Sequence, residues 1–324
     1  MFQQFALFAT LLAVTAGAQT VSKNVPRAPD GHPDLSGIWT NATLTPLQRP
    51  TDLAAKEFFS PQEAAAYEKR ALAAAADADN PAARKAGDPG SYNQAFFDRG
   101  NHIVKTRRTS LVVDPPDGRV PPFTASAQAR LEAQRAYAAQ HPADGPEDRD
   151  LSERCLMFSG YGPPMLAEPY NNNYQIVQSP GTVAILAEMN HNVRLIPTNG
   201  QVNLPPGVNQ WQGFSRGKWE GDTLVVETTR IKFNEQSHFG VAYRGMSDEN
   251  LRVVERFTRS DPDTIIYRAV VDDPTVYSRT WTLEIPLSRS AGPLYEYACH
   301  EGNYGMAGIL AGERAAEKRK AANQ

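Results

Sequence analysis

Residues 264–288 read TIIYRAVVDDPTVYSRTWTLEIPLS, and this stretch decides the fold. Its first half places Ile265, Tyr267, Ala269 and Val271 on one face of a strand. Its second half alternates in the same way, and one face carries Tyr277, Arg279, Trp281, Leu283, Ile285 and Leu287. A period of two is typical of antiparallel strands with one buried face. The short Asp-Asp-Pro connection between the halves favours pairing of the two strands.

Outward from this stretch, the same pattern predicts a run of strands over the second half of the chain. The predicted strands are Tyr174–Gln178, Thr182–Met189, Val193–Pro197, Thr223–Ile231, Leu251–Thr258, Thr264–Val271, Tyr277–Leu287 and Leu294–Cys299. Eight successive strands with short turns favour an up-and-down, lipocalin-like barrel, because closure removes exposed edges. Such a barrel is just wide enough for one small ligand. A β-sandwich and a small propeller are the alternative architectures.

The first half of the chain has a mixed pattern. A short strand is predicted around Trp39 and another over Thr109–Asp114. Ser60-Pro-Gln-Glu63 is a helix start with a capping box, and a second helix is predicted over Ala125–Gln140. We therefore expect residues 19–154 to wrap around a β-rich body formed by residues 155–324, as one structural unit. A C-terminal helix is predicted over Ala307–Ala321.

The N-terminus predicts export. Met1–Ala18 is an apolar run that ends in Ala-Gly-Ala, which is typical of a signal peptide cleaved after Ala18. The run has no Lys or Arg before it, and a buried first helix is the alternative interpretation. No later stretch reaches the ~20 apolar residues that span a bilayer. We therefore expect a periplasmic or secreted protein without a membrane span.

The chain has two cysteines, Cys155 and Cys299. In an oxidising compartment an even number of cysteines favours a disulfide. The alternatives are two free buried thiols, or Cys299 as a nucleophile beside His300.

The charge balance excludes one class of partner. The formal net charge is −3, with 33 basic and 36 acidic residues. No basic excess is available for phosphate contacts, so nucleic acid is not an expected partner.

Several blocks resemble one protein family. They are Pro33-Asp-Leu-Ser-Gly-Ile-Trp39, Asp114-Pro-Pro-Asp-Gly-Arg-Val-Pro-Pro122, Asn171-Asn-Asn-Tyr-Gln-Ile-Val-Gln178, Gly217-Lys-Trp-Glu-Gly-Asp-Thr-Leu-Val-Val226 and Tyr297–Gly305. Together they resemble a family of exported, largely uncharacterised bacterial proteins, over nearly the whole mature chain. The resemblance implies export but brings no catalytic residue. Gly37-Ile-Trp39 is also similar to the Gly-x-Trp start of lipocalin-like barrels, although the long segment after Trp39 departs from that plan.

The densest group of reactive side chains lies in Tyr295–Gly305. A histidine beside a carboxylate is suited to proton transfer near neutral pH, so His300 is the predicted base and Glu301 its partner. Tyr304 is the predicted electrophilic donor, and Asn303 is predicted to orient a substrate. The alternative is a structural corner in which these side chains satisfy backbone groups.

A second group surrounds the turn after the second predicted strand. Glu188, His191 and Arg194 are predicted to line a barrel mouth and to bind a polar ligand, with a solvated turn as the alternative. Asn172 and Tyr174 are further candidate ligand-binding residues, with a loop amide and a core ring as their alternatives. Two arginines, Arg99 and Arg154, are candidates for anion contact or for plain ion pairing.

No cofactor or metal is predicted. The chain lacks phosphate-cradling and dinucleotide motifs. His191, His238 and His300 have no metal-ligand spacing, so only the fold could bring them together. The sequence thus predicts an exported protein that handles a small organic molecule in a barrel cavity, by metal-independent acid–base catalysis as a lyase, isomerase or hydrolase. A non-catalytic binder and a structural envelope protein are the rival hypotheses.

Overall fold

The computed structural model describes residues 25–53, 55–78, 97–158, 160–200, 204–232 and 250–323. The predicted signal peptide Met1–Ala18 and His238 lie outside these residues.

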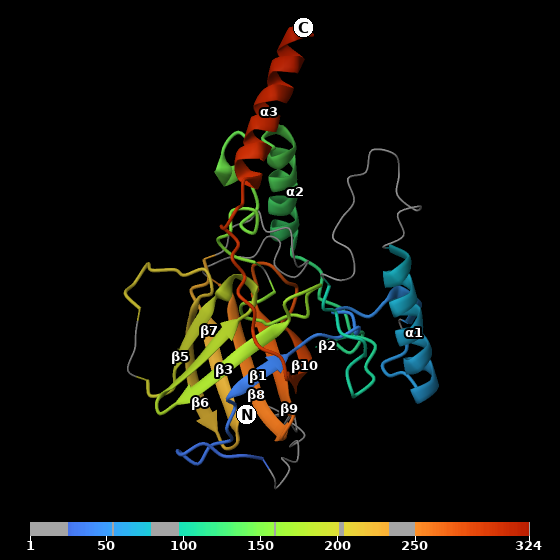
Figure 1. Ribbon diagram of the computed structural model, residues 1–324, viewed down its shortest axis with the longest axis vertical. Coiled ribbons are helices and arrows are strands. Elements are labelled where there is room, and N and C mark those ends of the chain that lie inside the picture. Colours follow the sequence, from blue (N-terminus) through green and yellow to red (C-terminus); the bar gives the residue numbers. More distant parts are fainter. Residues whose placement is uncertain are drawn as a thin grey trace, which may run out of the picture.

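One antiparallel sheet forms the body of the protein (Figure 1). Its strands follow the order β5-β4-β3-β1-β10-β9-β8-β7-β6, and β2 also pairs with β10. The strands are β1 (Gly37–Thr40), β2 (Val112–Asp114), β3 (Asn173–Ser179), β4 (Thr182–Ala187), β5 (Val193–Pro197), β6 (Phe214–Glu220), β7 (Thr223–Thr229), β8 (Arg252–Asp261), β9 (Thr264–Asp272) and β10 (Trp281–Arg289). The sheet curls into a nearly closed barrel, which confirms the predicted barrel-like class over the sandwich and the propeller.

The barrel has a seam between β5 and β6, the two ends of the strand order. No strand pairing joins them in the described part of the chain. Nine strands that each run antiparallel to their neighbour leave the first and the last parallel to each other. A direct β5–β6 ladder would therefore break the antiparallel pattern of the rest of the sheet.

The strand order corrects the predicted succession of eight strands. The early strand β1 inserts between β3 and β10, with Trp39 opposite Tyr174 on one side and Arg289 on the other. The predicted strand Leu294–Cys299 is wrong, because this segment is irregular. Strand β6 was not predicted, and β10 begins at Trp281 rather than at Tyr277.

The described residues contain three α-helices beside the barrel. Helix α1 (Pro61–Ala78) begins with the predicted capping box, in which the Ser60 amide donates to Glu63 Oε2 at 2.9 Å and the Glu63 amide donates to Ser60 Oγ at 3.3 Å. Helix α2 (Ala125–Gln140) has the predicted bounds, and α3 (Gly305–Ala322) is the predicted C-terminal helix. Figure 1 shows α2 and α3 at the same end of the barrel, while α1 stands to one side of it. Short 3-10 turns occur at Thr51–Leu53, Pro146–Asp148 and Met189–His191.

Large side chains fill the concave side of the sheet. The bulkiest fully buried ones include Trp39, Trp281, Tyr174, Tyr267 and Phe257. They form one hydrophobic cluster with side chains from β3 to β10. The pockets described below therefore lie at the flank and at one end of the barrel, not at its centre.

The two cysteines form the predicted disulfide, Cys155–Cys299, with 5.7 Å between their Cα atoms. A bonded sulfur is not a nucleophile, so the alternative of Cys299 catalysis beside His300 is excluded. Of the helices in the described residues, none combines the length and the apolar character needed to cross a membrane.

Candidate functional site

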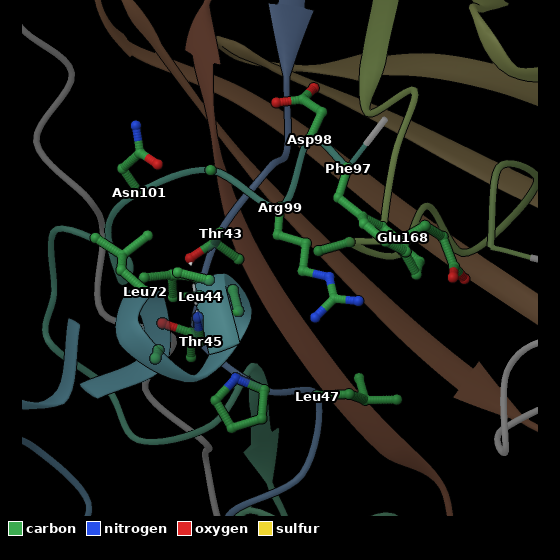
Figure 2. Close-up of a pocket in the computed structure, with 17 residues that line it drawn as sticks. Thr43, Leu44, Thr45, Leu47, Leu72, Phe97, Asp98, Arg99, Asn101 and Glu168 are labelled. Atoms are coloured by element: carbon green, nitrogen blue, oxygen red, sulfur yellow. Dashed lines mark hydrogen bonds between the residues drawn. The ribbon is translucent and has the colours of Figure 1, made fainter. Parts of the chain in front are cut away.

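A pocket of about 850 Å³ lies between α1 and the barrel (Figure 2). Four segments form its walls: residues 43–47, one side of α1, the loop 97–101 and residues 167–169. Leu44, Leu47, Leu72 and Phe97 make much of the lining apolar. Polar atoms contribute slightly more of the exposed lining than apolar atoms do. A small-molecule site combines apolar surface with convergent polar groups, and this pocket offers both.

One buried amide fixes two of these walls. Asn172 is fully buried, and its Nδ2 donates to the backbone oxygens of Asp98 at 2.6 Å and Glu168 at 2.7 Å. Its Oδ1 accepts from the Glu168 amide at 2.8 Å. The Asp98 amide also donates to the Pro169 carbonyl at 2.9 Å. Asn172 therefore positions the two acidic residues of the pocket instead of binding a ligand directly.

Glu168 is the unusual group in this pocket. Its carboxylate lies against Gly160, where a Cβ atom would stand 1.9 Å from Glu168 Oε1. No hydrogen bond or ion pair reaches this carboxylate from any described residue. Burial raises the pKa of Glu168 to about 8. The side chain is therefore largely protonated at neutral pH, the form in which a carboxylic acid donates a proton.

Arg99 brings the positive charge. Its guanidinium carbon lies 4.5 Å from the centre of the Phe97 ring, and within the described ranges it makes no ion pair. Figure 2 shows Arg99 reaching from its loop toward the middle of the pocket, with α1 on one side and Glu168 on the other. The neighbouring Asp98 carboxylate points away from Arg99 in the same view. Its pKa is raised, first by burial and then by the charge of Glu188.

The pKa of Glu168 predicts a measurable pH dependence of stability. The folded pKa of about 8 lies above the ordinary value of 4.5, so the folded state keeps a proton that the unfolded state has lost. Stability is thus fully present below about pH 4.5 and falls as the pH rises to about 8. We expect Glu168→Gln to flatten this fall by about 2–3 kcal/mol between pH 5 and pH 8, since it removes the titrating group. Urea unfolding across this pH range measures the free energy of unfolding of both proteins. If that free energy changes with pH equally in the variant and the unaltered protein, Glu168 does not have the raised pKa.

The structure places the predicted catalytic group elsewhere. His300, Glu301 and Tyr304 lie in an exposed turn before α3, and Tyr304 is 83% exposed. None of the three lines the pocket beside the disulfide, whereas Asn303 does. Because Leu294–Cys299 is not a strand, the face that His300 was expected to share with Glu296 does not exist. The catalytic role of this group stays a prediction without a cavity to support it.

Two of the predicted ligand-binding residues hold the protein's own C-terminal segment. Glu188 is buried and accepts from Asn173 Nδ2 at 2.7 Å and from the Tyr295 amide at 3.1 Å. His191 is exposed, and its Nδ1 donates to the Tyr297 carbonyl at 3.1 Å. These contacts guide the irregular segment across the barrel end to the disulfide.

The other two lie inside the barrel. Tyr174 is fully buried, and its hydroxyl has no hydrogen-bond partner in the described part of the chain. Arg194 forms a buried ion pair with Glu255, with Arg194 Nη1 at 3.0 Å from Glu255 Oε1 and Nη2 on Glu255 Oε2. Tyr267 donates its hydroxyl to the same carboxylate at 2.9 Å. The side chains of Tyr174 and Arg194 thus lie in the barrel interior, not at its mouth.

The Arg194 ion pair bridges the seam. Arg194 lies on β5 and Glu255 on β8, and the guanidinium also donates to Ser215 on β6 at 3.3 Å and to Thr228 on β7 at 3.4 Å. One side chain therefore connects β5 to three strands on the other side of the unpaired edges. Glu255 cannot be recognised from sequence, because a single carboxylate in a strand resembles a residue on the exposed face.

Asp98 and Glu168 were also missed as pocket residues. Neither has a motif or a periodic pattern around it, and Glu168 stands among prolines in an irregular segment. Only Arg99 was a candidate, as an anion contact. The one local signal for Glu168 is the glycine at position 160, whose role depends on a contact eight residues along the chain.

Comparisons with known proteins add no functional information. No family model matches this sequence, and no curated protein or solved structure is significantly similar to it. The family resemblance of the sequence blocks stays a prediction.

Proposed function

We propose that this protein binds a small organic anion in the pocket between α1 and the barrel, and that it acts on the anion by metal-independent acid–base catalysis. The observation that carries the proposal is the Arg99 guanidinium, which reaches into a pocket of about 850 Å³ without an ion pair from any described residue. A positive charge on an apolar wall is expected to select an anion, and a planar fork of donors suits a carboxylate.

The rest of the lining suits the body of such a ligand. Leu44, Leu47 and Leu72 offer an apolar surface, while Thr43 and Asn101 offer hydrogen bonds at the edge. This division favours an organic acid with an aliphatic or aromatic part over an inorganic anion.

Glu168 supplies the acid of the proposed chemistry. Efficient proton transfer needs a pKa near the operating pH, and burial brings Glu168 into that range. In the proposed reaction Glu168 gives its proton to a carbonyl or leaving-group oxygen, and it takes the proton back from water or from the substrate. A lyase, an isomerase or a hydrolase needs no further co-reactant than water. Because the protonated form is active, the rate is expected to fall as the pH rises through about 8.

Isothermal titration calorimetry measures the binding of two simple probes, hexanoate and phenylacetate. Arg99→Gln is expected to weaken their binding about tenfold, since it removes a charge-assisted contact. The matched control is Arg154→Gln, because Arg154 is another guanidinium without an ion pair to a described residue and does not line the pocket. Equal loss in both variants, or no binding by the unaltered protein, would contradict the proposal.

The same experiment separates the rival hypotheses. If the probes bind but no substrate in an organic-acid panel is turned over, the protein is a binder and Glu168 has no catalytic role. A structural envelope protein is expected to bind neither probe. The proposed export is tested separately, by N-terminal sequencing of the mature protein, which should begin near residue 19.

A further inference from the structure

A second pocket, of about 520 Å³, lies at the end of the barrel beside the disulfide. Three aromatic residues line it, Phe158, Tyr170 and Tyr297, together with Met306 and Ile309 of α3. It is separate from the α1 pocket, although Tyr170 contacts Phe97 of that pocket at 6.2 Å between ring centres.

The aromatic rings form a corner. Phe158 and Tyr297 meet nearly edge to face, with 5.5 Å between ring centres and 77° between the ring planes. Two contacts hold the backbone at Tyr297. Its carbonyl oxygen accepts a hydrogen bond from His191, and Cys299, two residues later, is held by the disulfide. Phe158 belongs to the buried core and Tyr297 is half-buried, so Tyr297 offers most of the ring surface of this corner. Because its position is already fixed, binding carries little ordering cost there.

The charge of the pocket is negative. Its lining contains two carboxylates, Glu153 and Glu296, and no Lys, Arg or His. Glu153 is already paired with Arg149, whose Nε and Nη2 donate to its two oxygens at 2.9 and 2.6 Å. Glu296 is exposed and makes no ion pair with a described residue. One carboxylate thus remains available beside the rings.

We propose that this pocket binds an organic cation of the methylated ammonium type. The electron-rich faces of aromatic rings attract a cation with little hydration, and Glu296 adds a full negative charge at the rim. The methyl groups of such a ligand suit the apolar surface of Met306 and Ile309. A metal ion is a poor fit, since the described residues contain no cluster of three metal-ligating side chains.

The test is isothermal titration calorimetry on the full disulfide-bonded protein with choline as the probe. Its neutral isostere, 3,3-dimethylbutan-1-ol, has the same shape without the charge. Choline is expected to bind at least about fivefold more tightly than the isostere, as an interaction of about 1 kcal/mol requires. Equal affinity for both, or no binding of choline, would overturn the proposal.

Two variants form a matched pair. Glu296→Gln removes the available carboxylate and is expected to weaken choline binding about fivefold. Glu132→Gln changes another exposed carboxylate, on α2, that does not line the pocket, and it should leave binding unchanged. Equal effects of the two variants would overturn the assignment. Tyr297→Phe keeps the ring and should bind choline, whereas Tyr297→Leu should not. If Tyr297→Leu fails to fold, the comparison of the two glutamate variants still tests the proposal.

A methylated ammonium group occurs both in free amines and in lipid headgroups. Cosedimentation with phosphatidylcholine vesicles distinguishes these sources. Binding of free choline alone indicates a soluble ligand, and additional vesicle binding that Glu296→Gln weakens indicates a headgroup. The proposal would be overturned if free choline does not bind and the Glu296→Gln variant binds vesicles as well as the unaltered protein does.

Discussion

Replacing Arg194 with methionine is expected to lower the free energy of unfolding by about 3–5 kcal/mol. The substitution leaves Glu255, which is fully buried, without its only cationic partner among the described residues. The hydroxyl of Tyr267 is too weak a donor to stabilise a buried charge alone. Methionine keeps most of the side-chain volume, so the loss comes from the uncompensated carboxylate and from the lost connection across the seam.

Chemical denaturation followed by tryptophan fluorescence measures this effect. The matched control is Arg279→Met, which breaks an exposed pair in which Arg279 Nη2 donates to the two oxygens of Asp114 at 2.9 and 2.8 Å. That change should cost less than about 1 kcal/mol, because water screens the pair. Adding Glu255→Leu to Arg194→Met should restore most of the loss, since it removes the unpaired charge. A similar cost for the two single arginine variants would show that the seam does not depend on the ion pair.

Gly160→Ala is expected to cost about 3–4 kcal/mol and to displace the Glu168 carboxyl. The new methyl group would stand 1.9 Å from Glu168 Oε1, and the backbone there has φ +92°, which side chains disfavour. The loop has little freedom to relax, because the Gly160 carbonyl accepts from the Leu166 amide at 2.7 Å. Once displaced toward water, the carboxyl should titrate closer to its ordinary pKa of 4.5.

Gly207→Ala separates the two causes. Gly207 has a similar φ of +78°, but a Cβ atom there meets nothing within 4 Å, so only the backbone cost of about 1–2 kcal/mol applies. The double variant Gly160→Ala/Glu168→Ala removes the collision and should recover about 1–3 kcal/mol relative to additivity. Unfolding curves give these energies, and a pH titration of stability follows Glu168. An equal loss of stability in Gly160→Ala and Gly207→Ala would mean that the position of the Glu168 carboxyl does not depend on the absence of a side chain at residue 160.

The site was less predictable from sequence than the fold, as three residues illustrate. Arg99 was recognised as a candidate anion contact, because a basic side chain in a polar loop is visible locally. For Asn172 the sequence leaves a ligand-binding amide and a loop amide open, and its observed hydrogen bonds go to backbone groups in two other segments. Glu168 has no local signal besides Gly160, since its raised pKa arises from burial that only the folded chain creates.

Features whose partners lie close along the chain, or have only one possible partner, are predictable from sequence. The Ser60–Glu63 capping box, the bounds of α2 and the period-two faces of β9 and β10 depend on neighbours a few residues away. With only two cysteines, any intramolecular disulfide had to join Cys155 to Cys299.

Contacts between distant segments are visible only in the folded protein. The four residues of β1 carry no pattern that selects β3 and β10 as neighbours, and the pairing follows from how the sheet curls. The seam, the Arg194–Glu255 pair and the half-buried position of Glu168 arise in the same way. Their free energy depends on water being excluded by residues far apart in sequence, and no local pattern encodes that exclusion.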